Sequence, residues 1–175
     1  MRLFHVSEED NIEFFEPRLP TRTDLDQRTG LVWAINDKCL PNFLTPRNCP
    51  RVTYHIGKNT SEDDVERYFS STNSTHVVVI ENKWFETMKN TKLYLYEFDS
   101  KQFELLDEIA GYYISKTSQV PIERLEIIDL FNEHFNRNVE IRIVDNLWDI
   151  CEEIQKTSLS WSMCRMEFAQ PKKLL

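Results

Sequence analysis

Short strand-like segments occur along almost the whole chain, and helical segments separate them at irregular intervals. Strands are predicted for the segments that are β-branched, apolar or alternating: Arg2–Val6, Leu31–Ile35, Arg51–Ile56, His76–Glu81, Leu93–Phe98, Gly111–Ser115 and Val139–Val144. This order does not match the regular alternation of strand and helix that builds a doubly wound parallel sheet. It favours the α+β class, with a mixed, mostly antiparallel sheet and a few short helices.

The helices are predicted from caps and from periodicity. Ser61 with Asp64 resembles a capping box, and apolar residues at helical spacing follow it, so an amphipathic helix is expected over Ser61–Ser71. The segment Ile122–Phe135 fits either a strand or one helix face; a strand over Leu125–Ile128 followed by a short helix is favoured. The other helical predictions are a turn at Glu8–Asp10, a short helix over Lys83–Lys89 and a helix face formed by Leu147, Ile150, Cys151 and Ile154.

Length and composition suggest a single folding unit. The chain has 175 residues, no repeat and only 3 Gly, so nothing marks a domain boundary. Apolar residues make up 41%, enough to build a core. We therefore expect one α+β domain over residues 1–175.

Charge and hydropathy limit the partners and the location. Lys and Arg total 21 against 29 Asp and Glu, a formal charge of -8, which disfavours non-specific binding to nucleic acid. Apolar runs such as Val77–Ile80 are far shorter than the roughly 20 residues that span a membrane, and the start of the chain has no signal-peptide pattern. A cytoplasmic protein without a membrane partner is expected. The oligomeric state stays open.

The four cysteines predict neither a disulfide framework nor a metal site. They are far apart and form no CxxC pair, so reduced thiols are expected. Cys39, Cys49 and His55 match no common zinc spacing, and no metal is predicted. Cys49 lies between Arg47 and Arg51, where positive charge could lower the pKa of the thiol; the alternative is a buried, inert cysteine.

Polar residues that could form a site gather in the first third of the chain. His5 and Ser7 lie on the first predicted strand, and Trp33 lies on the second. Pro46 and Pro50 stiffen a loop that carries Arg47 and Arg51, and rigid loops suit binding sites. The structural alternatives are a histidine satisfied within the fold and arginines paired with surface carboxylates.

Two of these segments resemble a known family. Phe4-His5-Val6-Ser7 and Leu31-Val32-Trp33-Ala34-Ile35 look like the opening of ADP-ribosyltransferase-like domains, which the related tRNA phosphotransferases share. The resemblance implies that His5 and Ser7 contact the ribose of NAD and that Trp33 packs against the nicotinamide. Arg47 or Arg51 would then neutralise the pyrophosphate.

Later segments look like the end of the same family. Leu93–Phe98, Gly111–Ser115 and Val120-Pro121-Ile122-Glu123 resemble its two strands followed by a Val-Pro pair, and the catalytic glutamate belongs near there. Glu108 and Glu123 are the candidates, although neither lies in a recognisable glutamate motif. The chain also resembles, over most of its length, a small bacterial family labelled only as a domain of unknown function.

Three hypotheses follow. The first is an NAD-binding transferase-like enzyme in which Glu123 or Glu108 stabilises an oxocarbenium-like state at the ribose–nicotinamide bond. The second is a non-enzymatic binding module for a small anionic or nucleotide ligand or for a protein partner. The third, ranked last, is a thiol-dependent enzyme with Cys49 as nucleophile and His55 as base.

Overall fold

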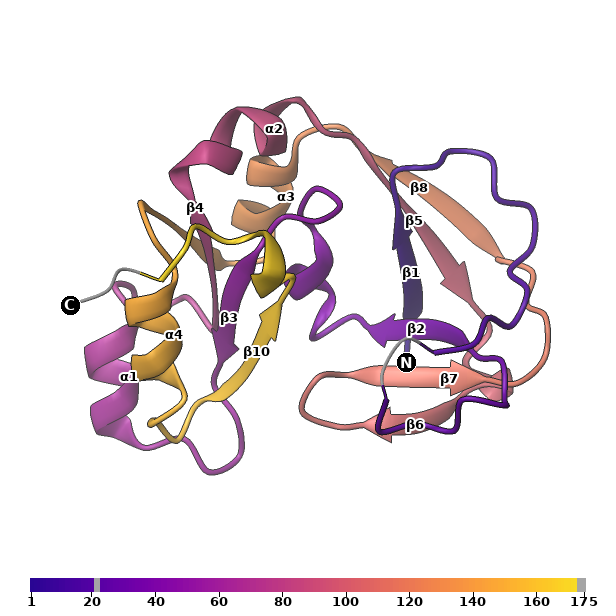
Figure 1. Cartoon of the computed structure of the whole chain (residues 1–175), viewed down its shortest axis with the longest axis horizontal. Helices are drawn as coiled ribbons and strands as arrows, with labels where there is room; N and C mark the ends of the chain where they lie inside the picture. Colours follow the sequence, from indigo (N-terminus) through magenta and orange to yellow (C-terminus); the bar gives the residue numbers. More distant parts are fainter. Residues whose placement is uncertain (21–22, 173–175) are drawn as a thin grey trace. The chain divides into compact units, whose positions relative to one another are not determined.

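The computed structural model describes residues 1–20 and 23–172. By its internal contacts the chain divides into two compact units. Unit 1 comprises Met1–Leu40 and Leu93–Ile127, and unit 2 comprises Pro41–Lys92 with the chain from Ile128 onward. Each unit is built around its own sheet (Figure 1). That the whole chain acts as a single domain stays a prediction.

Unit 1 is a six-stranded sheet in the order β6-β7-β2-β1-β5-β8, and every pairing in it is antiparallel. Its strands are β1 (Leu3–Ser7), β2 (Val32–Asn36), β5 (Leu93–Phe98), β6 (Glu104–Asp107), β7 (Tyr112–Ser115) and β8 (Glu123–Ile127), with a short 3-10 helix, η3 (Ser100–Gln102), between β5 and β6. The order places β6 and β8 at the two edges.

Alternate residues of each strand define two faces of this sheet. The first face carries Leu3, Ala34 and Phe98, which form a core cluster with Phe15 from the loop after β1. The second face carries Phe4, opposite Ile35 on β2. Residues of both faces are buried, so apolar residues do not alternate with polar ones along β1.

Unit 2 is a four-stranded sheet in the order β10-β3-β4-β9, made of β3 (Arg51–His55), β4 (His76–Glu81), β9 (Val139–Val144) and β10 (Ser160–Cys164). The β4–β9 pair is the one parallel pairing among the described strands. The helices are α1 (Glu62–Tyr68), α2 (Phe85–Asn90), α3 (Leu130–Asn136) and α4 (Trp148–Ile154), and the 3-10 turns are η1 (Leu40–Phe43), η2 (Asn82–Trp84) and η4 (Met166–Phe168).

The core of unit 2 lies where α1 and α4 cover one face of its sheet (Figure 1). Tyr68 of α1 and Ile154 of α4 pack with Tyr54 and Val77, which are opposite each other on β3 and β4. The Tyr54 hydroxyl donates to the Tyr68 carbonyl at 3.0 Å, so the polar end of this buried ring is satisfied. All six residues of β4 are buried, as its apolar run predicts.

The α+β class and the mostly antiparallel pairing are confirmed. The Ser61 hydroxyl accepts from the Asp64 amide at 3.3 Å and caps α1, which is shorter than the predicted Ser61–Ser71. The ambiguous segment is a strand, β8, followed by a helix, α3. The predicted helical turn at Glu8–Asp10 is wrong, because that segment has no helical structure. Strands β6 and β10 were not predicted.

Candidate functional site

His5 is held by its own sheet. Its Nδ1 lies 3.2 Å from the Trp33 carbonyl oxygen, and its ring centroid is 4.7 Å from that of Phe15. Burial lowers the pKa of the imidazole, and the hydrogen bond to Trp33 opposes that shift only in part. The hydroxyl of Ser7, two residues on, accepts from the Glu9 amide at 3.1 Å. Both side chains thus have structural partners.

The structure does not bring the His5 and Trp33 side chains together. Phe4 is opposite Ile35, so His5 points to the first face of the sheet, while Trp33 points to the second. On that second face the Trp33 indole meets the Tyr112 ring edge to face, with centroids 5.3 Å apart. A ribose held by His5 and a nicotinamide packed on Trp33 would therefore have to lie on opposite sides of the sheet.

The two candidate glutamates also lie apart. Glu108 is exposed in the turn between β6 and β7, at one edge of the six-stranded sheet, and Glu123 is exposed on β8, at the other edge. Arg2 forks onto Glu97 at 3.0 and 2.6 Å and lies 3.9 Å from Glu123. These glutamates cannot serve one site together.

The two arginines of the proline-flanked loop belong to unit 2 and differ in environment. Arg51 is buried: its guanidinium donates to the carbonyls of Asn42 at 2.6 Å and of Cys49 at 2.9 Å, and it covers the ring of Phe43. Arg47 is exposed. Arg51 thus stabilises the loop through hydrogen bonds to backbone carbonyls. The sequence suggested ion pairs with surface carboxylates instead.

Cys49 is not an activated thiol. It is buried, and that burial raises its pKa to about 12 in spite of Arg51, so the structure supports the alternative of a buried, inert cysteine. His55 lies at the far end of β3, where its ring stacks on His76 at 4.5 Å. Five extended residues separate the strand's ends by roughly 13 Å, so Cys49 and His55 form no nucleophile–base pair.

Burial sets the expected order of cysteine reactivity. Cys164, half-buried on β10, should alkylate first; burial raises the pKa of Cys39 to about 11 and leaves Cys49 inaccessible. Brief iodoacetamide treatment at neutral pH followed by peptide mass spectrometry measures the order. Faster labelling of Cys49 than of Cys164 in the folded protein would contradict this description.

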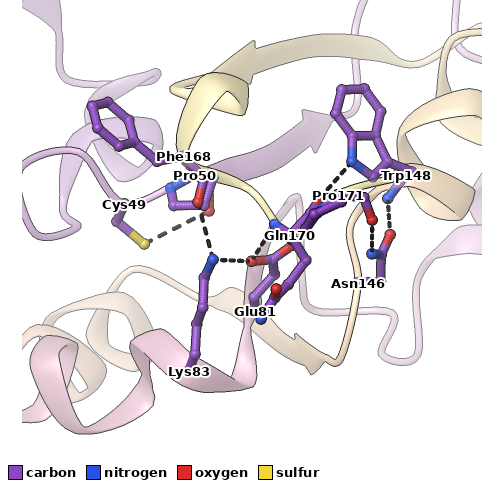
Figure 2. A network of polar contacts seen from close by, with 9 residues as sticks. All are labelled: Cys49, Pro50, Glu81, Lys83, Asn146, Trp148, Phe168, Gln170 and Pro171. Atoms are coloured by element: carbon purple, nitrogen blue, oxygen red, sulfur yellow. Dashed lines mark hydrogen bonds and ion pairs between the residues drawn. The ribbon is translucent and has the colours of Figure 1, made fainter. Parts of the chain in front are cut away.

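A polar network in unit 2 surrounds a fully buried carboxylate, Glu81, at the end of β4 (Figure 2). Glu81 accepts from the Gln170 amide at 2.9 and 3.1 Å and is 3.2 Å from the Lys83 ammonium, which donates to the Phe168 carbonyl at 3.0 Å. The Trp148 indole donates to the Gln170 carbonyl at 2.8 Å. These bonds hold residues 168–171 against the sheet. They also occupy the Glu81 carboxylate, which gives it a structural role.

Unit 1 contains a surface groove of about 380 Å³. It is lined by residues 10–13 of the loop after β1, by residues 121–124 at the start of β8, and by Tyr96. The Tyr96 hydroxyl donates to the Glu9 carbonyl at 2.6 Å and accepts from the Ile12 amide at 3.2 Å, which fixes the loop. The groove is thus formed by segments far apart in sequence that hydrogen bonds hold in place.

The groove combines apolar surface with negative charge. Ile122 is 66% exposed in it, and the neighbouring Val120 and Phe14 are 70% and 56% exposed. Asp10, Glu13 and Glu123 line it, against a single cation, Arg124. Arg124 donates to the Asp10 carbonyl and covers the ring of Tyr94, so its charge is already held by the protein.

Of the predicted site residues, only Glu123 lies in this groove. The others that the sequence suggested are on the first face of the sheet, on its second face, at the opposite edge or in unit 2. The sequence carried one overlooked signal: Val120, Pro121 and Ile122 are apolar but directly precede Glu123-Arg124, the charged start of a strand. Charges on a strand are typical of an exposed sheet edge, which predicts that the apolar residues beside them are also accessible.

Fold and site together define an α+β protein with an apolar, acidic groove at one edge of an antiparallel sheet. The chain belongs to the Family of unknown function (DUF6886), whose sequence profile matches residues 4–169. Comparisons with curated proteins and with solved structures found no match. The resemblance to a domain-of-unknown-function family is confirmed, and the resemblance to ADP-ribosyltransferase-like domains stays a prediction.

Across residues 1–20 and 23–172, no group of three or more His, Cys, Asp or Glu side chains is placed to hold a metal ion. Within the same residues, no helix has the length and apolar character needed to cross a membrane.

Proposed function

We propose that the chain is a non-enzymatic binding module, and that unit 1 takes a segment of a protein partner in the groove beside β8. The observation that carries the proposal is the exposed Ile122 in a groove lined by three carboxylates and one engaged arginine. An exposed apolar patch with a charged rim is typical of an interaction surface.

The charge of the groove selects among ligands. A small anion would meet Asp10, Glu13 and Glu123, and the guanidinium of Arg124 is already bonded to a carbonyl. A segment with lysine or arginine side chains would instead pair with these carboxylates while its apolar residues cover Ile122. The groove therefore favours a basic and apolar protein segment over the anionic or nucleotide ligand of the sequence analysis.

Binding is favoured over catalysis because the candidate catalytic residues are dispersed. His5 and Trp33 point to opposite faces of one sheet, and Glu108 and Glu123 lie at its opposite edges. Acid–base or electrostatic catalysis needs such groups within reach of one reacting centre. This dispersed arrangement supports a binding module over the NAD-binding transferase-like hypothesis.

An NMR titration of the 15N-labelled chain tests the proposal. Addition of a ten-residue peptide of alternating lysine and valine should shift the amide signals of Ile12, Ile122 and Glu123, whereas the glutamate–valine counterpart should not bind. Ile122→Ser removes the apolar side chain of the groove without adding charge and should weaken binding of the lysine–valine peptide at least fivefold. Leu105→Ser, at a 52% exposed site on the opposite edge, is the matched control.

Two results would overturn the proposal. One is the absence of shifts in the groove with the lysine–valine peptide. The other is a rise in melting temperature with millimolar NAD that His5→Ala abolishes in a folded protein, because a ligand that binds only the native state stabilises it. The second result would favour the transferase-like enzyme.

A further inference from the structure

We infer that the partner segment binds in extended form, as an additional strand along the outer edge of β8, with basic side chains beside Glu123. The inference rests on the proposed function and specifies its mode. Strand addition supplies affinity through backbone hydrogen bonds and specificity through alternate side chains.

The edge at β8 is regular enough to accept a strand. It is the last strand of the six-stranded sheet, and none of the described strands pairs with its outer side. Its register with β5 runs without interruption from Leu93↔Ile127 to Glu97↔Glu123. The Ile122 amide continues the pairing by donating to the Glu97 carbonyl at 2.8 Å. The edge therefore presents an extended backbone that runs directly into the groove.

The opposite edge of the same sheet is less suited. Strand β6 has only four residues, and its register with β7 shifts between Leu105 and Asp107. A bulge of this kind increases local twist and interrupts the regular row of backbone groups that an added strand needs. Within unit 1 the geometry thus points to β8.

Charge at β8 indicates the composition of the added strand. Glu123 and Glu126 are both exposed. Glu123 is opposite Glu97 on β5, and Arg2 is bonded to Glu97, so two adjacent carboxylates share one guanidinium. A lysine or arginine opposite Glu123 would supply the missing positive charge, and opposite charges across strands stabilise pairing.

Apolar residues alternate with these charges along the edge. Leu125 and Ile127 are half-buried and share the second face of the sheet with Glu123, and the exposed Ile122 precedes them in the groove. Glu126 lies on the first face with Arg124, so a partner segment of alternating basic and apolar residues would place its basic side chains on the second face, beside Glu123, and its apolar side chains on the first.

Backbone-modified peptides test the inference on the unchanged protein. Two versions of the lysine–valine peptide are made, one with N-methyl groups on the valine amides and one with them on the lysine amides, so that each edge of the peptide loses its donors in turn. We expect at least one version to bind tenfold or more weakly than the unmodified peptide, and the unmodified peptide to slow hydrogen exchange at β8 amides.

Variants of the protein give the second measurement. Glu123→Lys should weaken binding of the lysine–valine peptide at least tenfold, while Glu104→Lys, on the opposite edge strand β6, should leave its affinity unchanged. Circular dichroism of each variant establishes that it is folded.

The outcomes separate the two claims. If the unmodified peptide binds the groove but both N-methylated versions bind equally well, strand addition is wrong and the binding module stands. If the unmodified peptide does not bind, both claims fail. If β8 amides are already protected in the free protein in a concentration-dependent way, a second copy of the chain occupies the edge and the inference is overturned.

Discussion

Arg51→Lys should lower the free energy of unfolding by about 2–3 kcal/mol, the range expected for hydrogen bonds to a buried charged group. The guanidinium donates to the carbonyls of Asn42 and Cys49 at once, and it is 6% exposed. A lysine ammonium cannot donate to both carbonyls in this geometry. Either one carbonyl or the buried ammonium would then lose its hydrogen-bond partner. Urea denaturation measures the effect as a lower midpoint with an unchanged slope.

Arg47→Lys is the matched control, since Arg47 is four residues away in the same loop but exposed. It should change the free energy of unfolding by less than about 0.5 kcal/mol, as surface substitutions usually do. Equal losses for the two variants would mean that the Arg51 bonds do not hold the loop. If Arg51→Lys reduced anion binding without reducing stability, Arg51 would be a ligand-binding residue instead.

Local features of the sequence predicted most of the fold. Strand β4 was predicted with its observed bounds. Its four middle residues, Val77–Ile80, are β-branched and apolar, which is typical of a buried strand. The cap at Ser61 was predicted because its hydroxyl needs nothing beyond the next three residues. Strand β10 was missed because Trp161 is the one strong strand former in Ser160-Trp161-Ser162; its structure comes from pairing with β3, more than 100 residues earlier.

The candidate site was harder to predict because it depends on long-range register. His5 and Trp33 each occupy a plausible strand, but the sequence does not specify that Phe4 pairs with Ile35, which sends the two side chains to opposite faces. Cys49 and the arginines are close in sequence, yet burial outweighs the positive charge and raises the pKa of the thiol. The groove needs residues 10–13 beside residues 121–124, a proximity that no local pattern reveals.

Acidification from pH 7.5 to 5.5 should destabilise the protein through His5 and His134. Burial lowers the pKa of both imidazoles in the folded chain, so the unfolded chain, with values near 6.5, binds protons more readily. Stability is then complete above the unfolded pKa and is lost as the pH falls below it, levelling once the folded pKa is passed. Each histidine contributes a slope of at most about 1.4 kcal/mol per pH unit.

The surroundings of His134 explain why protonation of its ring does not stabilise the folded chain. Its Nδ1 lies 2.6 Å from the Leu130 carbonyl and its Nε2 lies 3.2 Å from the Pro41 carbonyl. A neutral ring donates to only one of them, and the shorter distance assigns the proton to Nδ1. A second proton would complete the bond to Pro41, but the side chain is 0% exposed and the cost of burying the charge is the larger effect.

Urea denaturation at pH 7.5, 6.5 and 5.5 measures this dependence, with His134→Gln and His5→Gln as comparison variants. Each substitution removes one titrating group, so the slope of stability against pH should become shallower in each variant. His55 and His76 are unchanged in all three proteins. Carboxylates whose pKa is lowered, such as Glu97, lose their contribution only at lower pH. A stability that rises on acidification, or a slope that His134→Gln leaves unchanged, would show that His134 is not held as the neutral ring.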